Sequence, residues 1–413
     1  MVQKFLISYF LFFISILSLS NHAFSQSDSC HLRISLLTGS PGEELYSTFG
    51  HSAIRVTDTI SNEDIVYNYG TFDFGEPGFY TKFVRGKLMY YLSTEDFSSF
   101  KQSFQQEKRS LIEQVLNLSC NEKQKIMLLL QQNLMNENKF YKYDFLFDNC
   151  TTRLRDLLEK SVNTPANFTP VVNKPTTFRQ HIFEYMDYNN NQWTKLGMDI
   201  LLGNKTDAVM NNREAMFLPD YLLKGFDSAK IGNNPLIESK NIVVNMPAKN
   251  SSANSPKGVL WTGQNNFLTH PAFIFWLLLI AIVIMIFSKS EGAKKILYGF
   301  DGILFFITGF AGILMLFMWL GTDHIVCRNN YNLLWAWPTH AIAAFFVHSK
   351  KEWAGKYFLI TAIAYSVLLI AWFFLPQPLS TSLIPIILLL IFRSYVIARR
   401  HDSPSRSFGK AIS

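Results

Sequence analysis

Five apolar stretches in the last third of this 413-residue chain restrict what that part of the chain can fold into. A bilayer core is about 30 Å thick, and a helix of about 20 apolar residues spans it. The first, second and fourth stretches reach that length, while the third and fifth are shorter. Because lipid offers the backbone no hydrogen-bond partners, the pattern predicts an all-α bundle of about five transmembrane helices over residues 267–397. The stretches are Phe267–Phe287, Leu297–Leu320, Tyr331–Val347, Tyr357–Leu375 and Ser382–Phe392.

Basic residues are distributed unevenly around these stretches. The loops Ser288–Ile296 and Ser349–Lys356 and the tail from Arg393 carry eleven lysines and arginines, whereas the two intervening loops carry only Arg328. The positive-inside rule therefore places those segments, with a basic tail over residues 398–413, in the cytoplasm and exports the N-terminal part. The same segments account for the formal net charge of +7, so the basic composition does not indicate a nucleic-acid partner.

The start of the chain predicts a secreted protein. An apolar run, Phe5–Leu19, follows Lys4, and Ala23-Phe24-Ser25 supplies a small-residue cleavage pattern. These features are typical of a signal peptide over residues 1–25, which is removed during export. We expect an exported domain over residues 26–247 and a polar linker over residues 248–266 that leads into the membrane part.

All four cysteines, Cys30, Cys120, Cys150 and Cys327, fall on the exported side in this topology. Disulfides are permitted there. Cys30 with Cys120 is one possible pair, although spacing alone does not determine connectivity. A catalytic Cys150 would have to remain a free thiol.

The exported part combines strand and helix patterns. Alternating apolar residues predict strands at His31–Leu37, Ser52–Thr57, Ile65–Tyr69 and Arg109–Leu118. Helical spacing predicts helices at Asp96–Glu107, Asn121–Asn136, Thr177–Tyr185 and Trp193–Leu202. We therefore expect an α+β domain in which a small antiparallel sheet packs against helices.

The run YDFLFDNCTTRLRDLLEK places Cys150 where a helix is expected to begin. Asp148 or Asn149 can cap that helix. A helix N-terminus carries partial positive charge, which favours the thiolate, the nucleophilic form of cysteine. His51, in STFGHSAIRV, opens a predicted strand and is the candidate base that activates the thiol and then returns the proton.

A third polar group usually orients such a histidine. Asn68 and Tyr69 lie on the strand expected to pair with the His51 strand, and Asp73 follows shortly after, so these three residues are the candidates. The sequence contains no HExxH motif, no CxxC pair and no glycine-rich phosphate loop. We therefore expect neither a metal nor a cofactor.

The motifs GHSAIRV and DNCTTRLRDLL, with YNYGTFDF between them, resemble the Lnb-type lipoprotein N-acyltransferase family. The resemblance implies an exported thiol domain joined to membrane spans, with His51 and Cys150 as the catalytic pair. It also implies a reaction that moves an acyl chain from the diacylglyceryl ester of a lipoprotein to the α-amine of its N-terminal cysteine through a thioester. A histidine that precedes a helix-borne cysteine is similar to circularly permuted members of the papain-like superfamily.

Several polar residues are candidates for contacts with the substrate or with lipid head groups. They are Arg153 in the cysteine helix and Asp323, His324, Arg328, Asn330 and Asn332 in a predicted outer loop. We expect a multi-pass protein of the bacterial inner membrane whose partners are membrane lipid and lipoprotein substrates. Two alternatives are a papain-like amidase or peptidase acting on cell-wall peptide and a non-catalytic membrane scaffold.

Overall fold

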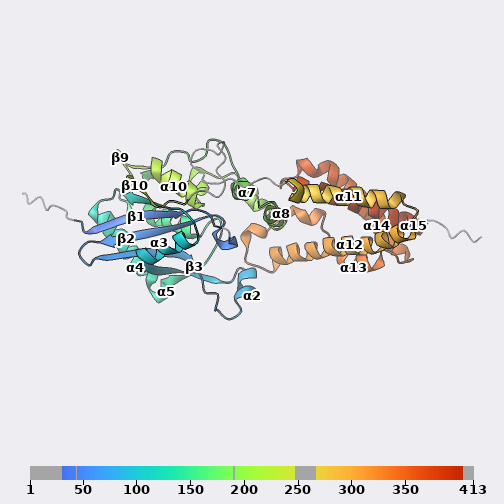
Figure 1. The fold of residues 1–413 in the computed structure, drawn as a ribbon, viewed down its shortest axis with the longest axis horizontal. Helices are drawn as coiled ribbons and strands as arrows, with labels where there is room; N and C mark the ends of the chain where they lie inside the picture. Colours follow the sequence, from blue (N-terminus) through green and yellow to red (C-terminus); the bar gives the residue numbers. More distant parts are fainter. Residues whose placement is uncertain (1–29, 43, 189–190, 247–266, 403–413) are drawn as a thin grey trace, which may run out of the picture.

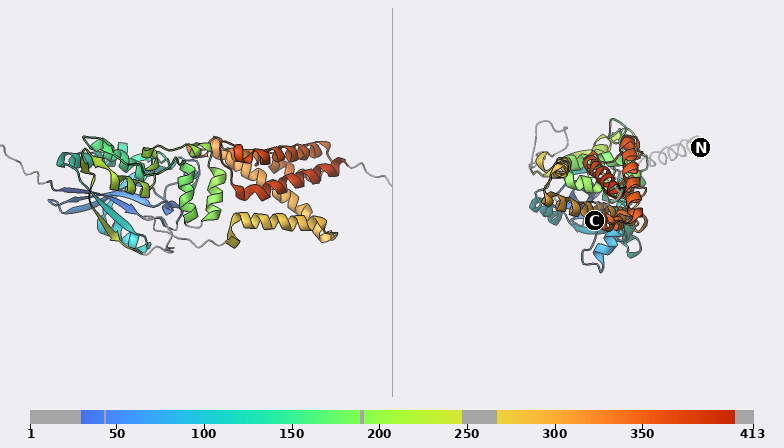
Figure 2. Two further views of the ribbon diagram at one scale, coloured as in Figure 1. Left: turned by 90° about the horizontal axis from the view of Figure 1, so that it is seen from above. Right: turned by 90° about the vertical axis from the view of Figure 1, so that its right-hand side faces the viewer.

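The computed structural model describes residues 30–42, 44–188, 191–246 and 267–402. An N-terminal α+β domain and a C-terminal helical region lie end to end along the long axis of the molecule (Figure 1). The view from above shows the same division (Figure 2, left). The expected signal peptide, the expected linker and the tail beyond residue 402 lie outside the described residues.

Seven antiparallel strands form the main sheet, in the order β10-β5-β1-β2-β3-β4-β6. The predictions of β1, β2, β3 and β5 from alternating apolar residues are confirmed. No strand was predicted at β4, β6 or β10. The strands are β1 (Leu32–Gly39), β2 (His51–Asp58), β3 (Glu63–Thr71), β4 (Met89–Asp96), β5 (Leu111–Leu116), β6 (Phe140–Lys142) and β10 (Ile237–Val244).

Helices flank this sheet, and the predicted helices α3, α4, α7 and α8 are confirmed within a few residues. A separate three-stranded sheet contains β7 (Ala166–Asn167), β8 (Lys230–Ile231) and β9 (Asn234–Pro235). The helices of the domain are α2 (Phe79–Val84), α3 (Phe97–Gln106), α4 (Cys120–Leu134), α5 (Asn136–Lys139), α6 (Cys150–Ser161), α7 (Phe178–Tyr188), α8 (Gln192–Leu201), α9 (Asn212–Ala215) and α10 (Pro219–Ser228).

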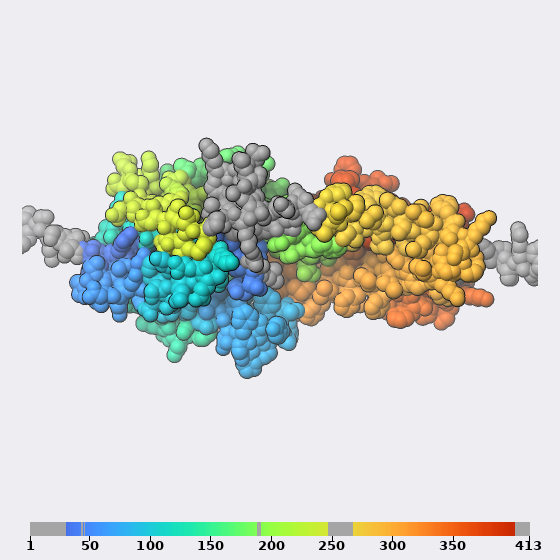
Figure 3. Space-filling model, in the orientation of Figure 1, coloured from blue at the N-terminus to red at the C-terminus, as the bar shows by residue number. Residues whose placement is uncertain are grey.

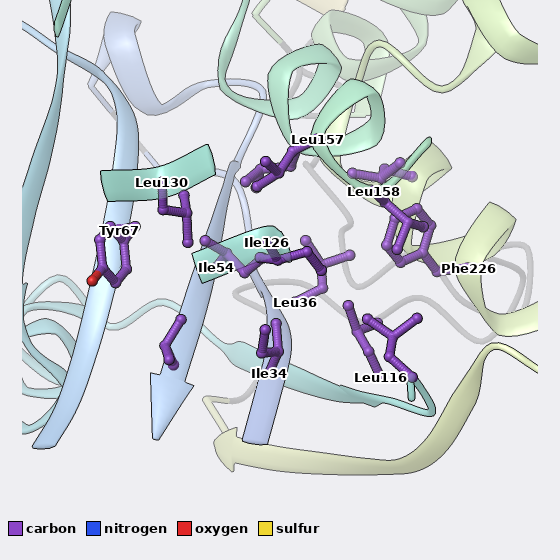
Figure 4. Packing of buried hydrophobic residues seen from close by; sticks show 14 of the residues in the cluster. Ile34, Leu36, Ile54, Tyr67, Leu116, Ile126, Leu130, Leu157, Leu158 and Phe226 are labelled. Carbon is purple, nitrogen blue, oxygen red and sulfur yellow. The ribbon is translucent and has the colours of Figure 1, made fainter. Parts of the chain in front are cut away.

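The main hydrophobic core holds helix α6 against the sheet. Leu157 and Leu158 of α6 pack with apolar side chains of the strands and of α4 (Figure 4). Burying one such side chain contributes roughly 1.5–3 kcal/mol. The core therefore fixes the start of α6 relative to the first residue of β2, His51. The labelled neighbours include Ile34, Leu36, Ile54, Ile126, Leu130 and Phe226.

A disulfide joins the beginning of the domain to the same core. Cys30, just before β1, is bonded to Cys120, the first residue of α4, with 5.3 Å between their Cα atoms. Within the part of the chain that the structure describes, Cys150 and Cys327 are the free cysteines. A disulfide agrees with an exported, oxidising location, and this pairing leaves Cys150 as a thiol.

The helical region differs from the expected five regular helices. Among the described residues, three helices are long and apolar enough to cross a membrane, and the apolar helix α11 is shorter. The long apolar helices are α11 (Pro271–Phe287), α12 (Glu291–Leu320), α14 (Glu352–Ala371) and α15 (Ile384–Asp402). The third stretch, Tyr331–Val347, does not form the continuous helix that we expected there.

This stretch consists of short helical turns in place of one continuous helix. Residues 331–347 form the 3₁₀ turn Tyr331–Leu334, helix α13 (His340–Ala343) and a second 3₁₀ turn, Ala344–Phe346. Pro338 lacks an N–H group and disfavours a helical conformation in the residue before it. The stretch therefore has the composition of a span without a continuous helix.

This irregular segment packs directly on the backbone of α12. A Cβ atom at Gly309 would lie 2.0 Å from the backbone nitrogen of Ala341, and one at Gly312 would lie 2.0 Å from the carbonyl oxygen of Ala336. Small residues permit such close approach between membrane segments. The two glycines thus let the segment run antiparallel to α12 with backbone against backbone.

Two groups of buried polar side chains in the helical region are paired, which lowers the cost of placing them in an apolar environment. Asp301 of α12 and Arg393 of α15 form a bidentate ion pair with N–O distances of 2.5 and 2.8 Å. The two ring nitrogens of His340 contact the hydroxyl groups of Tyr357 at 2.7 Å and of Tyr365 at 2.5 Å. These pairs tie α12 to α15 and the irregular segment to α14.

The N-terminal domain is docked on one end of the helical region. Asn330 donates to the carbonyl oxygen of Ile200 at 2.7 Å, and Asn332 donates to that of Asp199 at 3.0 Å. The loop over residues 321–332, which follows α12, therefore lies beside α8, whereas the lysine-rich loop before α12 lies at its opposite end. This arrangement agrees with the sidedness that the charge pattern predicts.

Gly312→Ala should destabilise the helical region. The added methyl group would meet the Ala336 carbonyl at 2.0 Å, and such overpacking costs about 1–3 kcal/mol. Gly299→Ala on the same helix is the matched control, because a Cβ atom there meets nothing within 4 Å and alanine is the better helix former. Thermal unfolding of the full chain in detergent should give a lower midpoint for Gly312→Ala alone. Equal midpoints for the two variants would contradict the described packing.

Candidate active site

Cys150 is the first residue of α6, and Asn149 is the cap of that helix. The side-chain oxygen of Asn149 accepts hydrogen bonds from the backbone N–H groups of Thr151 and Thr152, both at 2.8 Å. Its amide group donates to the Phe217 carbonyl at 3.0 Å, which fixes the side chain. The sulfur therefore lies at the positive end of a capped helix that is anchored in the core.

The first two residues of β2 lie against the start of α6. The His51 imidazole lies close enough to the Cys150 thiol for each group to shift the pKa of the other. The backbone N–H of Ser52 also lowers the pKa of this thiol, and the Ser52 hydroxyl lies 3.2 Å from the Thr151 hydroxyl in a buried contact. The structure thus places together the two residues that we expected to form the catalytic pair.

The surroundings favour a thiolate and an imidazolium. Burial raises the pKa of the Cys150 thiol, but the charge of His51 and the hydrogen bonds from His51 and Ser52 lower it more, to about 7. Burial lowers the pKa of His51, but the charge of Cys150 and the hydrogen bonds with Cys150 and Asn68 raise it above its ordinary value. Because the two pKa values approach each other, transfer of the proton from sulfur to nitrogen is favoured.

A relay of polar side chains orients His51. The Nε2 atom of His51 lies 3.1 Å from Oδ1 of Asn68, and the Asn68 amide group donates to Glu95 Oε1 at 2.7 Å. Because the amide nitrogen faces the carboxylate, the amide oxygen faces the ring and Nε2 carries the hydrogen. The other ring nitrogen, Nδ1, then faces the thiol.

The other two candidates for the orienting residue make different contacts. Tyr69 follows Asn68 on β3 and points to the opposite face of the sheet, where its hydroxyl accepts a hydrogen bond from Asn133 at 2.6 Å. The exposed Asp73 accepts a hydrogen bond from the Gly75 N–H at 2.8 Å and stabilises a turn. Asn68 is thus the candidate that lies against the imidazole.

Arg153 lies one turn along α6 and is paired. Its guanidinium donates to the Asp148 carboxylate at 2.6 and 2.8 Å and lies 3.4 Å from the centre of the Tyr141 ring. Asp148, the alternative cap, is therefore used by Arg153. Contact of Arg153 with a substrate stays a prediction.

Three polar residues of the outer loop lie at the junction of the two parts. Asp323 forms an ion pair with Lys142 of β6 at 3.0 Å, and His324 Nε2 contacts the Phe83 carbonyl at 3.1 Å. The hydrogen bond from Lys142, with a smaller effect from the charge of the exposed Arg328, keeps the pKa of Asp323 below its usual range. A role in binding lipid head groups stays a prediction for these three.

The expectation for Asn330 and Asn332 needs correction. Their side chains are 3% and 1% exposed, and their amide groups donate to carbonyl oxygens of α8. The two asparagines, which we expected to face a substrate, therefore join the helical region to the N-terminal domain.

Three further residues, Gly70, Tyr141 and Tyr143, lie near Cys150 and were not predicted. Gly70 has a positive φ of 89°, a conformation that favours glycine. A Cβ atom there would lie 3.6 Å from Cys150 Cβ, 3.9 Å from the Tyr143 ring and 4.0 Å from the Tyr141 hydroxyl. Tyr141 is 7% exposed, and its hydroxyl has no hydrogen-bond partner among the described residues. The alternating tyrosines of KFYKYD were the available signal for this wall of the site.

Two family models match the chain. The Lnb N-terminal periplasmic domain matches residues 19–184, and the Lnb transmembrane domain matches residues 262–401. The first match contains both His51 and Cys150, and the second contains the long apolar helices. No curated protein and no solved structure matches the chain.

Alkylation of Cys150 by iodoacetamide should follow a pKa of about 7. Since the thiolate is the reactive form, the rate should rise through a midpoint near that pH. Burial raises the pKa of Cys327 to about 11, so Cys327 should stay unreacted and serve as the internal control. His51→Ala should move the Cys150 midpoint upward by about one to two units. Peptide mass spectrometry measures both rates, and a midpoint that His51→Ala leaves unchanged would refute the pair.

Proposed function

This chain belongs to the Lnb family, and we propose that it is a membrane-bound cysteine acyltransferase that completes lipoproteins. The proposed reaction moves an acyl chain from the diacylglyceryl ester of a lipoprotein to the α-amine of the N-terminal cysteine. The observation that carries the proposal is the Cys150–His51 pair at the adjoining starts of α6 and β2, where the thiol pKa is lowered to about 7, in a domain joined to membrane helices.

The first half-reaction forms an acyl-enzyme. The Cys150 thiolate attacks the carbonyl carbon of the lipid ester, and the bond from that carbon to the glyceryl oxygen breaks. The His51 imidazolium gives its proton to the departing alkoxide, which leaves as an alcohol. The raised pKa of His51 supports this role, because the ring is protonated while the thiolate is present.

The second half-reaction transfers the chain. The α-amine of the lipoprotein attacks the thioester carbonyl, the carbon–sulfur bond breaks, and the thiolate is restored. His51, neutral after the first step, removes a proton from the amine. Nε2 is hydrogen-bonded to Asn68, so Nδ1 is the atom that carries the proton in both steps.

Both half-reactions place negative charge on a carbonyl oxygen. The backbone N–H of Cys150 at the helix start is one candidate donor for that oxyanion. The Tyr141 hydroxyl is the second, because it is buried beside Cys150 and lacks a partner among the residues described. A buried donor without a partner costs free energy, which an oxyanion bound there would recover.

We further propose a circularly permuted papain-like fold and an inner-membrane location with a cytoplasmic C-terminus. The support for the fold is a thiol at a helix N-terminus, a histidine on the adjoining strand and a histidine that comes first in sequence. The support for the location is the periplasmic domain match and the lysine-rich helix ends opposite that domain.

The tether to the membrane favours lipid substrates over cell-wall peptide. The same Cys150–His51 pair would serve an amidase or peptidase, whose substrate lies outside the bilayer and whose acceptor is water. An acyltransferase whose donor resides in the bilayer needs its thiol held at the bilayer surface and protected from water. The helical region, docked on α8 through Asn330 and Asn332, holds the domain there.

Cys150→Ala should abolish N-acylation of lipoproteins, because the thioester cannot form. Mass spectrometry of lipoprotein N-terminal peptides, from cells in which the variant is the sole copy, should detect free α-amines. Cys327→Ala is the matched control and should retain acylation. Persistent acylation in Cys150→Ala would refute the proposal. Altered wall-peptide fragments with unchanged lipoproteins would support the amidase, and wild-type behaviour of both Cys150→Ala and His51→Ala would support a scaffold.

Tyr141→Phe should lower kcat by about 10²-fold, the usual cost of removing one oxyanion donor. KM and the alkylation rate of Cys150 should stay unchanged, because the variant leaves the thiol pair intact. Tyr67→Phe is the control, since this buried tyrosine directs its hydroxyl to the Met127 sulfur in the core. A kcat equal to that of Tyr67→Phe would remove Tyr141 from the oxyanion site.

A further inference from the structure

Residues 72–87, which we name the aromatic segment, expose unusually large apolar side chains. Phe74 is 65% exposed, Tyr80 is 79% exposed and Phe83 is 45% exposed, and Val84 beside them is also exposed. Isolated exposed apolar residues are common, but a cluster of this kind marks an interaction surface. Arg85 and Lys87 at the end of the segment are exposed as well.

The aromatic segment is folded. Phe79 is buried and stacks on Phe72 and Phe83, with ring centroids 5.9 and 6.1 Å apart. An ion pair of 2.6 Å between Lys82 and Glu76 closes the turn before α2. The exposed rings are therefore presented by a defined structure around a small aromatic core.

The segment lies at the junction with the helical region. The carbonyl oxygen of Arg85 accepts a hydrogen bond from the Asp323 N–H at 2.9 Å, and that of Phe83 contacts His324 at 3.1 Å. Asp323 and His324 follow directly after α12, whose last residue, Leu320, is exposed and apolar. In the space-filling view the segment forms a blue lobe beside the near end of the helical region (Figure 3).

A row of aromatic rings leads from this segment to the thiol. Phe72 lies 5.3 Å from Tyr90, and Tyr90 stacks on Tyr143 at 4.5 Å, both measured between ring centroids. Tyr143 borders the space at Gly70 that Cys150 also borders. A continuous apolar wall therefore joins the exposed rings to the reactive sulfur.

We propose that the aromatic segment is a membrane-docking element that inserts Phe74, Tyr80 and Phe83 into the leaflet facing the N-terminal domain. Aromatic rings are favoured at the bilayer interface, and the basic end of the segment suits anionic head groups. A chain that leaves the leaflet beside these rings meets the row of Phe72, Tyr90 and Tyr143 and reaches Cys150 without crossing water. The route of the chain rests on the proposed acyltransferase function, whereas docking to lipid does not.

Labelling tests docking without reference to activity. Tyr80→Cys in a Cys150→Ala, Cys327→Ala background carries an environment-sensitive fluorophore, and the full chain is placed in nanodiscs of phosphatidylethanolamine and phosphatidylglycerol. Doxyl-labelled lipid should quench at least half of the signal. Ile60→Cys is the matched control, because Ile60 is 76% exposed in the β2–β3 hairpin, about 25 Å along β3 from its end at Thr71. Equal quenching at the two positions would overturn docking.

Turnover tests the route. Tyr80→Ser and Tyr90→Ala should lower acyl transfer from a diacylated lipopeptide in nanodiscs at least tenfold relative to hydrolysis of soluble p-nitrophenyl butyrate by the same protein. The ratio of the two rates does not depend on how much of the enzyme is folded, because both rates scale with that amount. A ratio equal to that of the wild type would overturn the route. A wild-type chain that cleaves the soluble ester but transfers no lipid chain would instead overturn the proposed function, and the quenching result would still decide docking.

Discussion

The contact between the first residues of β2 and the first turn of α6 is the interaction on which the rest of this molecule depends. Leu157 and Leu158 stabilise this contact by packing in the core, and the buried contact between the Ser52 and Thr151 hydroxyls stabilises it as well. The thiol pKa of about 7 depends on the charge of His51 beside Cys150. If His51 moved away while Cys150 stayed buried, burial would raise the thiol pKa, and the thiolate would be disfavoured without any change in residue identity.

Local patterns were enough to predict where Cys150 and His51 lie and much of what positions them. Alternation over β2 and β3 placed His51 and Asn68 on neighbouring strands, and the cap residues before CTTRLRDLL placed Cys150 at a helix start. These features depend on residues a few positions apart, so they can be predicted from local patterns in the sequence. Which of the three candidate residues meets the imidazole was decided by the face of β3, and that requires the packed sheet.

The unpredicted parts arise from contacts between distant residues. Glu95 completes the relay only because β4 pairs with β3 and sets Glu95 opposite Val66. Tyr141 and Tyr143 lie near Gly70 and Cys150 because β6 joins the far edge of the sheet. In the helical region, apolar composition alone could not separate a continuous helix from the turns around Pro338, since both bury similar surfaces. The close backbone contacts at Gly309 and Gly312, which accommodate the irregular segment, are visible only in the packed structure.

The Cys30–Cys120 bond has a consequence for how the protein is made. Synthesis begins at the N-terminus, so Cys30 and Cys120 are made before Cys150 and, in an exported domain, are exposed to the oxidising side before it. Pairing in order of arrival therefore yields the native bond without isomerisation. Once that bond has formed, neither of its sulfurs is available to Cys150, which remains a free thiol in the folded protein.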